Sequence, residues 1–192
     1  MKIITGSAKG KRLITLEGEA TRPTSERIKE AIFSSIQFDV EHRVVLDLFA
    51  GCGQMGLEAL SRGAAEVMFI DSSQDAMSII KANAKATALF DRGRYLVSDY
   101  RNYIRKAAAR DSFDLVFIDP PYGMMCCAEA VDRLRTAGML RRGALVVLEC
   151  GEEDLASPAE RFPAFDVIKD THYGKKTHVL ILFYRGEDGE GC

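Results

Sequence analysis

Residues 44–56 read Val-Val-Leu-Asp-Leu-Phe-Ala-Gly-Cys-Gly-Gln-Met-Gly, and this stretch decides the fold. An apolar run that carries one acid, Asp47, leads into a Gly-x-Gly-x-x-Gly spacing from Gly51 to Gly56. Such an order predicts a buried strand over Val44–Phe49, a tight turn, and a helix over Met55–Ser61.

The same rhythm of strand, turn and helix continues toward the C-terminus. Further strands are expected at 66–70, 94–98, 114–118 and 144–149, and further helices at 74–88, 100–109 and 128–137. The last two expected strands, 166–171 and 177–184, flank Gly174 and predict an antiparallel pair. Alternating strands and helices predict an α/β fold whose mostly parallel sheet is covered on both faces.

The chain before residue 44 has a different pattern. Residues 2–5 and 11–16 surround a glycine-containing turn and predict a β-hairpin, and Thr24 is expected to cap an amphipathic helix. We therefore expect a hairpin extension over 1–20, a main domain over 21–186 and a disordered tail over 187–192.

Composition excludes several classes of protein. The chain has 192 residues, 47% hydrophobic and 28% charged, which excludes disordered and fibrous proteins. No apolar run approaches the roughly 20 residues that cross a bilayer, and the N-terminus lacks the apolar core of a signal peptide. We therefore expect a cytoplasmic protein without a membrane segment.

Cysteine and histidine usage suggests neither disulfides nor a metal. The five cysteines lack Cys-x-x-Cys spacing, so a disulfide framework is not expected. The three histidines, His42, His172 and His178, do not cluster with the cysteines, and no metal site is predicted.

The glycine loop allows two interpretations. Asp71 follows Gly51 by twenty residues, at the end of the next expected strand, as in sites where an acid binds a ribose diol. This pattern serves both NAD and S-adenosylmethionine. The acids Asp47, Asp99 and Asp119 near other strand ends favour S-adenosylmethionine, because a buried Asp47 could pair with its ammonium group and Asp99 could accept from adenine.

The sequence Asp119-Pro120-Pro121-Tyr122 is typical of methyltransferases that act on exocyclic amines of bases. The carboxylate of Asp119 and the carbonyl of Pro120 could accept both amine hydrogens, which would localise the nitrogen lone pair. The ring of Tyr122 could stack on the base, a contact worth roughly 1–3 kcal/mol.

Five segments in fixed order carry a closer resemblance: KIITG (2–6), KGKRL (9–13), TRPTSERIKEAIF (21–33), DLFAGCG (47–53) and DPPY (119–122). Over essentially its whole length the chain resembles the RsmD family of bacterial 16S rRNA guanine-N2 methyltransferases. The resemblance implies a Rossmann-like class I methyltransferase fold, with a seven-stranded, mostly parallel sheet. It also implies S-adenosyl-L-methionine as cofactor and 16S rRNA in an assembling 30S particle as partner, with no membrane, no metal and a monomer favoured.

The resemblance also implies roles for individual residues. Those implied at the cofactor are Arg22, Thr24, Asp47, Phe49, Gly51, Gly53, Asp71, Ser72, Asp99 and Tyr100. Those implied in catalysis are Asp119, Pro120 and Tyr122. Residues 1–12 hold four bases and no acid, so Lys9, Lys11 and Arg12 are expected to meet rRNA phosphates.

Three alternatives remain open from the residues. Adenine-N6 methylation of DNA or RNA uses the same Asp-Pro-Pro-Tyr chemistry, but we expect it to need a target-recognition domain for which 192 residues leave no room. An NAD-dependent oxidoreductase predicts a catalytic Lys, His or Tyr-x-x-x-Lys set that the chain does not show. A non-catalytic RNA-binding module would have no use for Asp-Pro-Pro-Tyr.

Overall fold

The structure is a computed structural model that describes residues 1–15, 23–121, 123–151, 157–174 and 177–186. Two compact units divide the chain, Met1–Tyr100 and Arg101–Cys192. Within the described ranges, no helix has the length and apolarity that spanning a membrane requires. The expected division at residue 20 stays a prediction, and the tail 187–192 lies outside the described residues.

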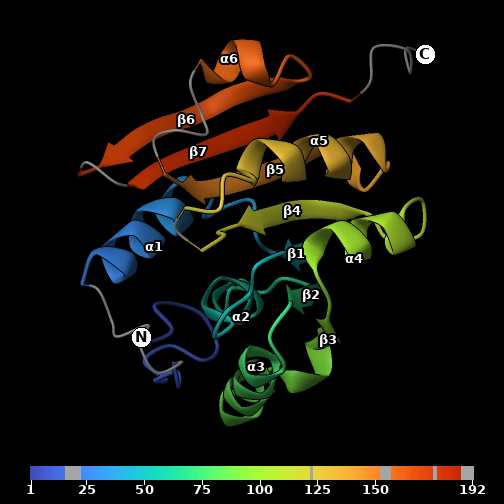
Figure 1. The fold of residues 1–192 in the computed structure, drawn as a ribbon. Coiled ribbons are helices and arrows are strands. Elements are labelled where there is room, and N and C mark those ends of the chain that lie inside the picture. The colour runs from blue at the N-terminus through green and yellow to red at the C-terminus, as the bar shows by residue number, and fades with distance from the viewer. Residues whose placement is uncertain (16–22, 122, 152–156, 175–176, 187–192) are drawn as a thin grey trace. The chain divides into compact units, whose positions relative to one another are not determined.

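The first unit contains three parallel strands in the order β3-β2-β1 (Figure 1). The strands are β1 (Val44–Asp47), β2 (Glu66–Asp71) and β3 (Gly93–Val97). The helices are α1 (Pro23–Ser35), α2 (Gln54–Ser61), α3 (Gln74–Ala86) and the short 3₁₀ helix η1 (Phe90–Arg92), while α4 (Tyr100–Ala107) starts at the unit's last residue. Because α1 begins at Pro23, Thr24 lies in its first turn and not before it, so the expected cap is wrong.

Close packing of α2 against β2 depends on a glycine. A Cβ atom added to Gly56 would lie 2.3 Å from Cε1 of Phe69 and 2.8 Å from Cγ1 of Val67. Only glycine therefore lets the start of α2 approach the buried face of β2 this closely.

The expected N-terminal hairpin does not appear as a pair of strands. Among the described residues before β1, a single antiparallel bridge joins Lys2 to Arg12, and no strand is present. Backbone hydrogen bonds accompany this bridge: Ile3 donates to Lys11 at 2.9 Å, Gly10 to Ile3 at 2.9 Å and Leu13 to Met1 at 3.0 Å. The amides of Ile4 and Thr5 donate instead to the Glu58 carboxylate at 2.7 and 3.0 Å, which ties this short pairing to α2.

Glu58 is itself buried with a cation. Lys29 of α1 lies 3.6 Å from the Glu58 carboxylate and donates to the carbonyl of Lys2 at 2.6 Å. Burial lowers the pKa of Lys29, an effect that Glu58 partly offsets. This pair joins α1, α2 and the N-terminal segment.

The second unit contains four strands in the order β4-β5-β7-β6. They are β4 (Phe113–Ile118), β5 (Leu140–Cys150), β6 (Phe165–Tyr173) and β7 (Thr177–Tyr184), with α5 (Cys127–Thr136) and α6 (Pro158–Arg161). β4 and β5 are parallel, while β7 runs antiparallel to both β5 and β6. The seven strands and the antiparallel final pair confirm the mixed pattern that the sequence predicts.

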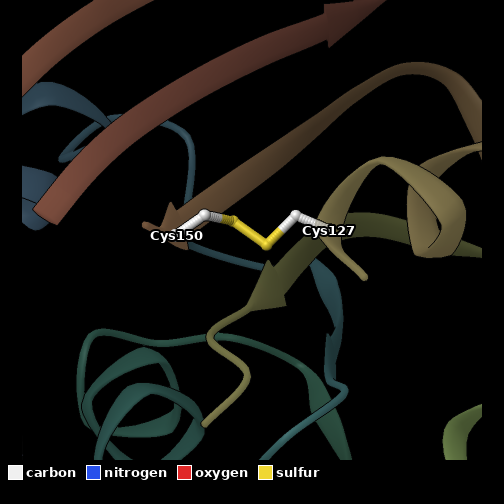
Figure 2. The surroundings of a disulfide bond; sticks show 2 residues. All are labelled: Cys127 and Cys150. Atoms are coloured by element: carbon white, nitrogen blue, oxygen red, sulfur yellow. A yellow bond between two sulfur atoms is a disulfide. The ribbon is translucent and has the colours of Figure 1, made fainter. Parts of the chain in front are cut away.

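A disulfide in the second unit overturns the expectation of unpaired cysteines. Cys127 opens α5 and Cys150 ends β5, and their sulfur atoms are bonded (Figure 2). The two residues meet because α5 starts beyond the carboxyl end of β4, and the parallel β5 ends at the same edge. Sequence spacing alone does not show such a long-range approach.

Candidate cofactor and amine-binding sites

Acids gather at the carboxyl edge of the three strands in the first unit. Asp47 ends β1, Asp71 ends β2, and Asp99 follows β3 by two residues. The parallel register pairs Asp47 with Phe69 and Asp71 with Val97, so the strand ends are staggered along one edge. In open α/β sheets ligands bind beyond this edge.

Asp47 is buried and bonded within the glycine loop. Its Oδ2 accepts the amide hydrogen of Gly56 at 2.9 Å, and the residue is 2% exposed. Burial raises the pKa of Asp47 to about 7; the Gly56 amide lowers it and the charge of Asp71 raises it further. The structure thus supplies an internal amide as partner where the sequence suggested the cofactor's ammonium group.

Asp71 ties the same loop to β2. Its Oδ2 accepts the Gly51 amide and its Oδ1 accepts the Ser73 amide, each at 2.8 Å. A carboxylate oxygen has two acceptor sites, so each oxygen can accept one further hydrogen. The half-buried Asp71 can therefore hold the loop and bind a vicinal diol at once.

The glycine loop needs its left-handed residues. Gly51 and Gly53 have φ of 54° and 81°, a region that other residues rarely adopt. The Gly53 amide donates to the Ala50 carbonyl at 2.6 Å, which closes the turn before α2. The turn directs the first amides of α2 toward the carboxyl edge of the strands.

The remaining expected cofactor residues of the first unit line the same edge. Phe49 and Tyr100 lie with ring centroids 5.1 Å apart; Tyr100 is only 2% exposed, so the half-buried Phe49 is the ring that a ligand could reach. Ser72 is exposed and Asp99 is half-buried. Arg22 lies outside the described residues, as does the side chain of Thr24.

Gln54 is a further candidate for the site that the sequence reasoning did not single out. Its Oε1 is buried and accepts no hydrogen bond from the part of the chain that the structure describes. It stands at the first position of α2, inside the glycine loop. An unsatisfied buried carbonyl is costly, and a ligand N–H group would satisfy it. Its position in the x-x of the glycine motif was the sequence signal that could have identified it.

The expected catalytic residues lie in the second unit. Asp119 directly follows β4 and is half-buried, and Pro120 is buried. Tyr122 falls outside the described residues. Beyond it, Met125 is 61% exposed, which leaves an apolar side chain beside this loop.

The three bases expected to bind RNA are all exposed. Lys9 and Lys11 stand on either side of Gly10, whose φ is 81°, and Arg12 forms the bridge to Lys2. They lie close together in one turn, which is the grouping that the sequence predicts.

Comparison with known proteins places this geometry in a family. The sequence profile of the family described as "Conserved hypothetical protein 95" matches residues 1–182. The chain belongs to this family. Among its relatives, "Putative rRNA methyltransferase YlbH" of Bacillus subtilis is 34% identical over 80% of this chain and 84% of the relative. "Ribosomal RNA small subunit methyltransferase D" of Haemophilus influenzae is 29% identical over 78% of each chain.

Solved structures agree with the family. "Putative methyltransferase yhhF" from Escherichia coli is 26% identical and superposes with a TM-score of 0.83 over 97% of this chain and 99% of that one. A tRNA m1G37 methyltransferase of M. jannaschii, 18% identical, shares the fold with a TM-score of 0.67 over 88% of this chain and 49% of that one. The fold is that of the α/β class I methyltransferases, and family membership implies S-adenosyl-L-methionine as methyl donor.

Proposed function

We propose that this protein transfers a methyl group from S-adenosyl-L-methionine to the exocyclic N2 amine of a guanine in 16S rRNA during small-subunit assembly. The observation that carries the proposal is Asp119-Pro120, which stands directly beyond the carboxyl end of β4 in a chain of this family. Relatives named for the small ribosomal subunit support the choice of RNA.

On the cofactor side, the residues bind and orient. The free acceptor sites of Asp71 suit the ribose hydroxyls, and the unsatisfied Oε1 of Gln54 suits the ammonium group. Phe49, which packs against the buried Tyr100, offers an apolar face for the adenine. When bound, the cofactor supplies a methyl group on a sulfonium, which an amine can displace without a metal.

On the amine side, Asp119 has the main role. A base amine is a weak nucleophile because its lone pair is delocalised into the ring. Hydrogen bonds to the Asp119 carboxylate and the Pro120 carbonyl localise that lone pair. As the nitrogen–carbon bond forms and the sulfur–carbon bond breaks, the surplus proton on nitrogen can pass to Asp119. Tyr122 holds the base by stacking.

The Asp119→Ala variant tests this assignment. We expect turnover to fall by about 100-fold, the effect of removing one positioned polar group from a transition state, while cofactor affinity stays unchanged. Radiolabelled methyl transfer to 30S particles from a gene-deleted strain measures the turnover. Asp166→Asn, an exposed acid on β6 of the same unit, is the matched control. Near-normal turnover in Asp119→Ala would remove this residue from the mechanism.

The chemical identity of the product separates guanine from adenine methylation. Mass spectrometry of nucleosides from 16S rRNA, with and without the gene, should show one N2-methylguanosine that depends on the gene. A gene-dependent N6-methyladenosine would instead support the alternative target. Since ribosomes assemble in the bacterial cytoplasm, we propose that the protein acts there.

The basic turn is proposed to contact rRNA phosphates. Replacing Lys9, Lys11 and Arg12 together by Ala should weaken particle binding and make the slope of log K against log salt shallower, because fewer counterions are released. The exposed side chains leave the core unaffected, so the melting temperature should stay close to that of the wild type. Filter binding across a salt series measures both quantities, and an unchanged slope would place RNA docking elsewhere.

A further inference from the structure

The β6–β7 hairpin brings together three side chains that the proposed function does not use. Asp170 and His172 alternate along β6, so they share one face of the strand. His178 of β7 stands directly opposite His172 in the antiparallel register. One ligand atom from each of the three residues lies within 4.8 Å of the others.

The contacts within this cluster, defined as Asp170, His172 and His178, are close. Nε2 of His178 lies 2.5 Å from Oδ1 of Asp170, and the two imidazole rings are stacked with centroids 4.0 Å apart. His178 is only 3% exposed. Its Nδ1 is buried and has no hydrogen-bond partner in the described part of the chain.

A bound metal would take the place of the proton between Nε2 of His178 and Oδ1 of Asp170, so that both atoms become ligands. His172, directly opposite His178 in the register, supplies the third donor.

The donor set selects a class of metal. Two imidazoles and one carboxylate suit zinc and neighbouring first-row divalent ions, whereas calcium and magnesium prefer oxygen ligands alone. Three protein ligands leave a fourth tetrahedral position for water or another donor.

Only modest movement would complete the site. Bonds of about 2.0–2.1 Å in a tetrahedral site separate ligand atoms by about 3.3 Å. Donor atoms that lie up to 4.8 Å apart must close by about 1.5 Å, while Nε2 of His178 and Oδ1 of Asp170, now 2.5 Å apart, must open by about 0.8 Å. β6 is the edge strand of the second unit, and both Asp170 and His172 are exposed, so their side chains can turn.

We propose that Asp170, His172 and His178 form a binding site for a divalent metal of the zinc class. The register places this site at a functional edge of the second unit. His178 pairs with Cys150 at the carboxyl end of β5, and Ile118 of β4 pairs with Leu148 of the same strand. The metal would therefore lie at the same strand ends as the loop that begins with Asp119, about 10–14 Å away across two to three strand spacings.

Zinc titration against a chromophoric chelator tests the proposal on the full-length protein, stripped of metal beforehand. Reductant is left out, because thiols bind zinc and because Cys150, opposite His178, must remain in its disulfide. We expect the wild type to bind one equivalent. The variant His172→Ala should bind zinc at least about 10-fold more weakly. Because the side chain of His172 is exposed, its removal should leave the fold intact.

A matched control and a spectroscopic readout decide between outcomes. His42→Ala removes a histidine of the first unit that is 88% exposed and should bind zinc as the wild type does. Nitrogen-15 spectra of the histidine rings should shift for His172 and His178 on zinc addition and stay unchanged for His42. Equal affinity in wild type and His172→Ala, or no stoichiometric binding by the wild type, would overturn the proposal and leave the cluster as a proton-sharing pair. Neither result depends on methyl transfer.

Discussion

Replacing Asp47 by Asn should remove part of the pH dependence of stability. Asp47 is buried at the end of β1, and its pKa is raised from the ordinary 3.8 to about 7 by burial. A raised pKa means that the folded state binds this proton more tightly than the unfolded state does. The stabilisation is therefore complete below pH 3.8 and is lost as the pH rises through about 7.

The size of the effect follows from the two pKa values. Linkage converts a shift from 3.8 to about 7 into roughly 2–3 kcal/mol of unfolding free energy lost by the wild type between pH 5 and pH 8. Asn keeps a carbonyl that can accept the Gly56 amide hydrogen and carries no charge at any pH. The Asp47→Asn variant should lose less stability than the wild type over this range by about that amount.

Urea denaturation followed by circular dichroism, at intervals from pH 5 to pH 8, measures the difference. Burial also raises the pKa of Glu149 to about 7, so both proteins keep a remaining slope and only the gap between them is diagnostic. Asp75→Asn, an exposed acid in the first turn of α3, should follow the wild type. Parallel curves for wild type and Asp47→Asn would show that Asp47 is ionised at little cost and would refute the reasoning.

Two further predictions concern the same loop. Asp71→Asn should weaken S-adenosylmethionine binding, measured by calorimetry, by about 10- to 100-fold, which is the scale of hydrogen bonds lost from a charged acceptor. The control Asp75→Asn should bind as the wild type does. A wild type that binds NADH and ignores S-adenosylmethionine would contradict the cofactor assignment. Gly56→Ala should lower the unfolding free energy by about 1–3 kcal/mol, because the added Cβ would clash with Phe69. In the control Gly151→Ala the added Cβ meets no atom within 4 Å, so its stability should be nearly that of the wild type. Equal melting temperatures for Gly56→Ala and the wild type would show that Phe69 and β2 can move aside at little cost.

The alternation of strands and helices could be predicted from the sequence because the hydrophobic residues of each segment recur with the spacing of a strand or of a helix. The expected strand 66–70 and helix 74–88 differ from β2 and α3 by no more than two residues at either end. The acids at the strand ends were predictable for the same reason: they follow apolar runs directly.

Features that depend on distant partners could not be predicted in this way. The N-terminal segment pairs only briefly with itself, and the amides of Ile4 and Thr5 find their acceptor in Glu58, more than fifty residues later. The bond between Cys127 and Cys150 depends on the ends of two elements meeting at one edge. Asp47 was correctly placed, but its partner Gly56 is fixed by the loop's conformation and not by composition.

The histidine cluster was missed for a reason of register. The sequence ends the first strand of the final pair at Thr171, whereas β6 continues to Tyr173. With the shorter strand, His172 falls in the turn and has no cross-strand neighbour. The two additional residues of β6 place it opposite His178, so an error of one strand end concealed a side-chain cluster.

Helix α2 connects two parts of the proposed activity within the first unit. At its start, the Gly56 amide holds Asp47 and shapes the cofactor loop. One half-turn later, Glu58 holds the segment that carries the basic turn, and Lys29 and Arg62 pair with its carboxylate. Because both contacts are made by this one helix of eight residues, we expect a shift of the basic turn to displace the cofactor loop as well. A burial as costly as the Lys29–Glu58 pair is then understandable: it fixes the surface proposed to meet rRNA relative to the site proposed to supply the methyl group.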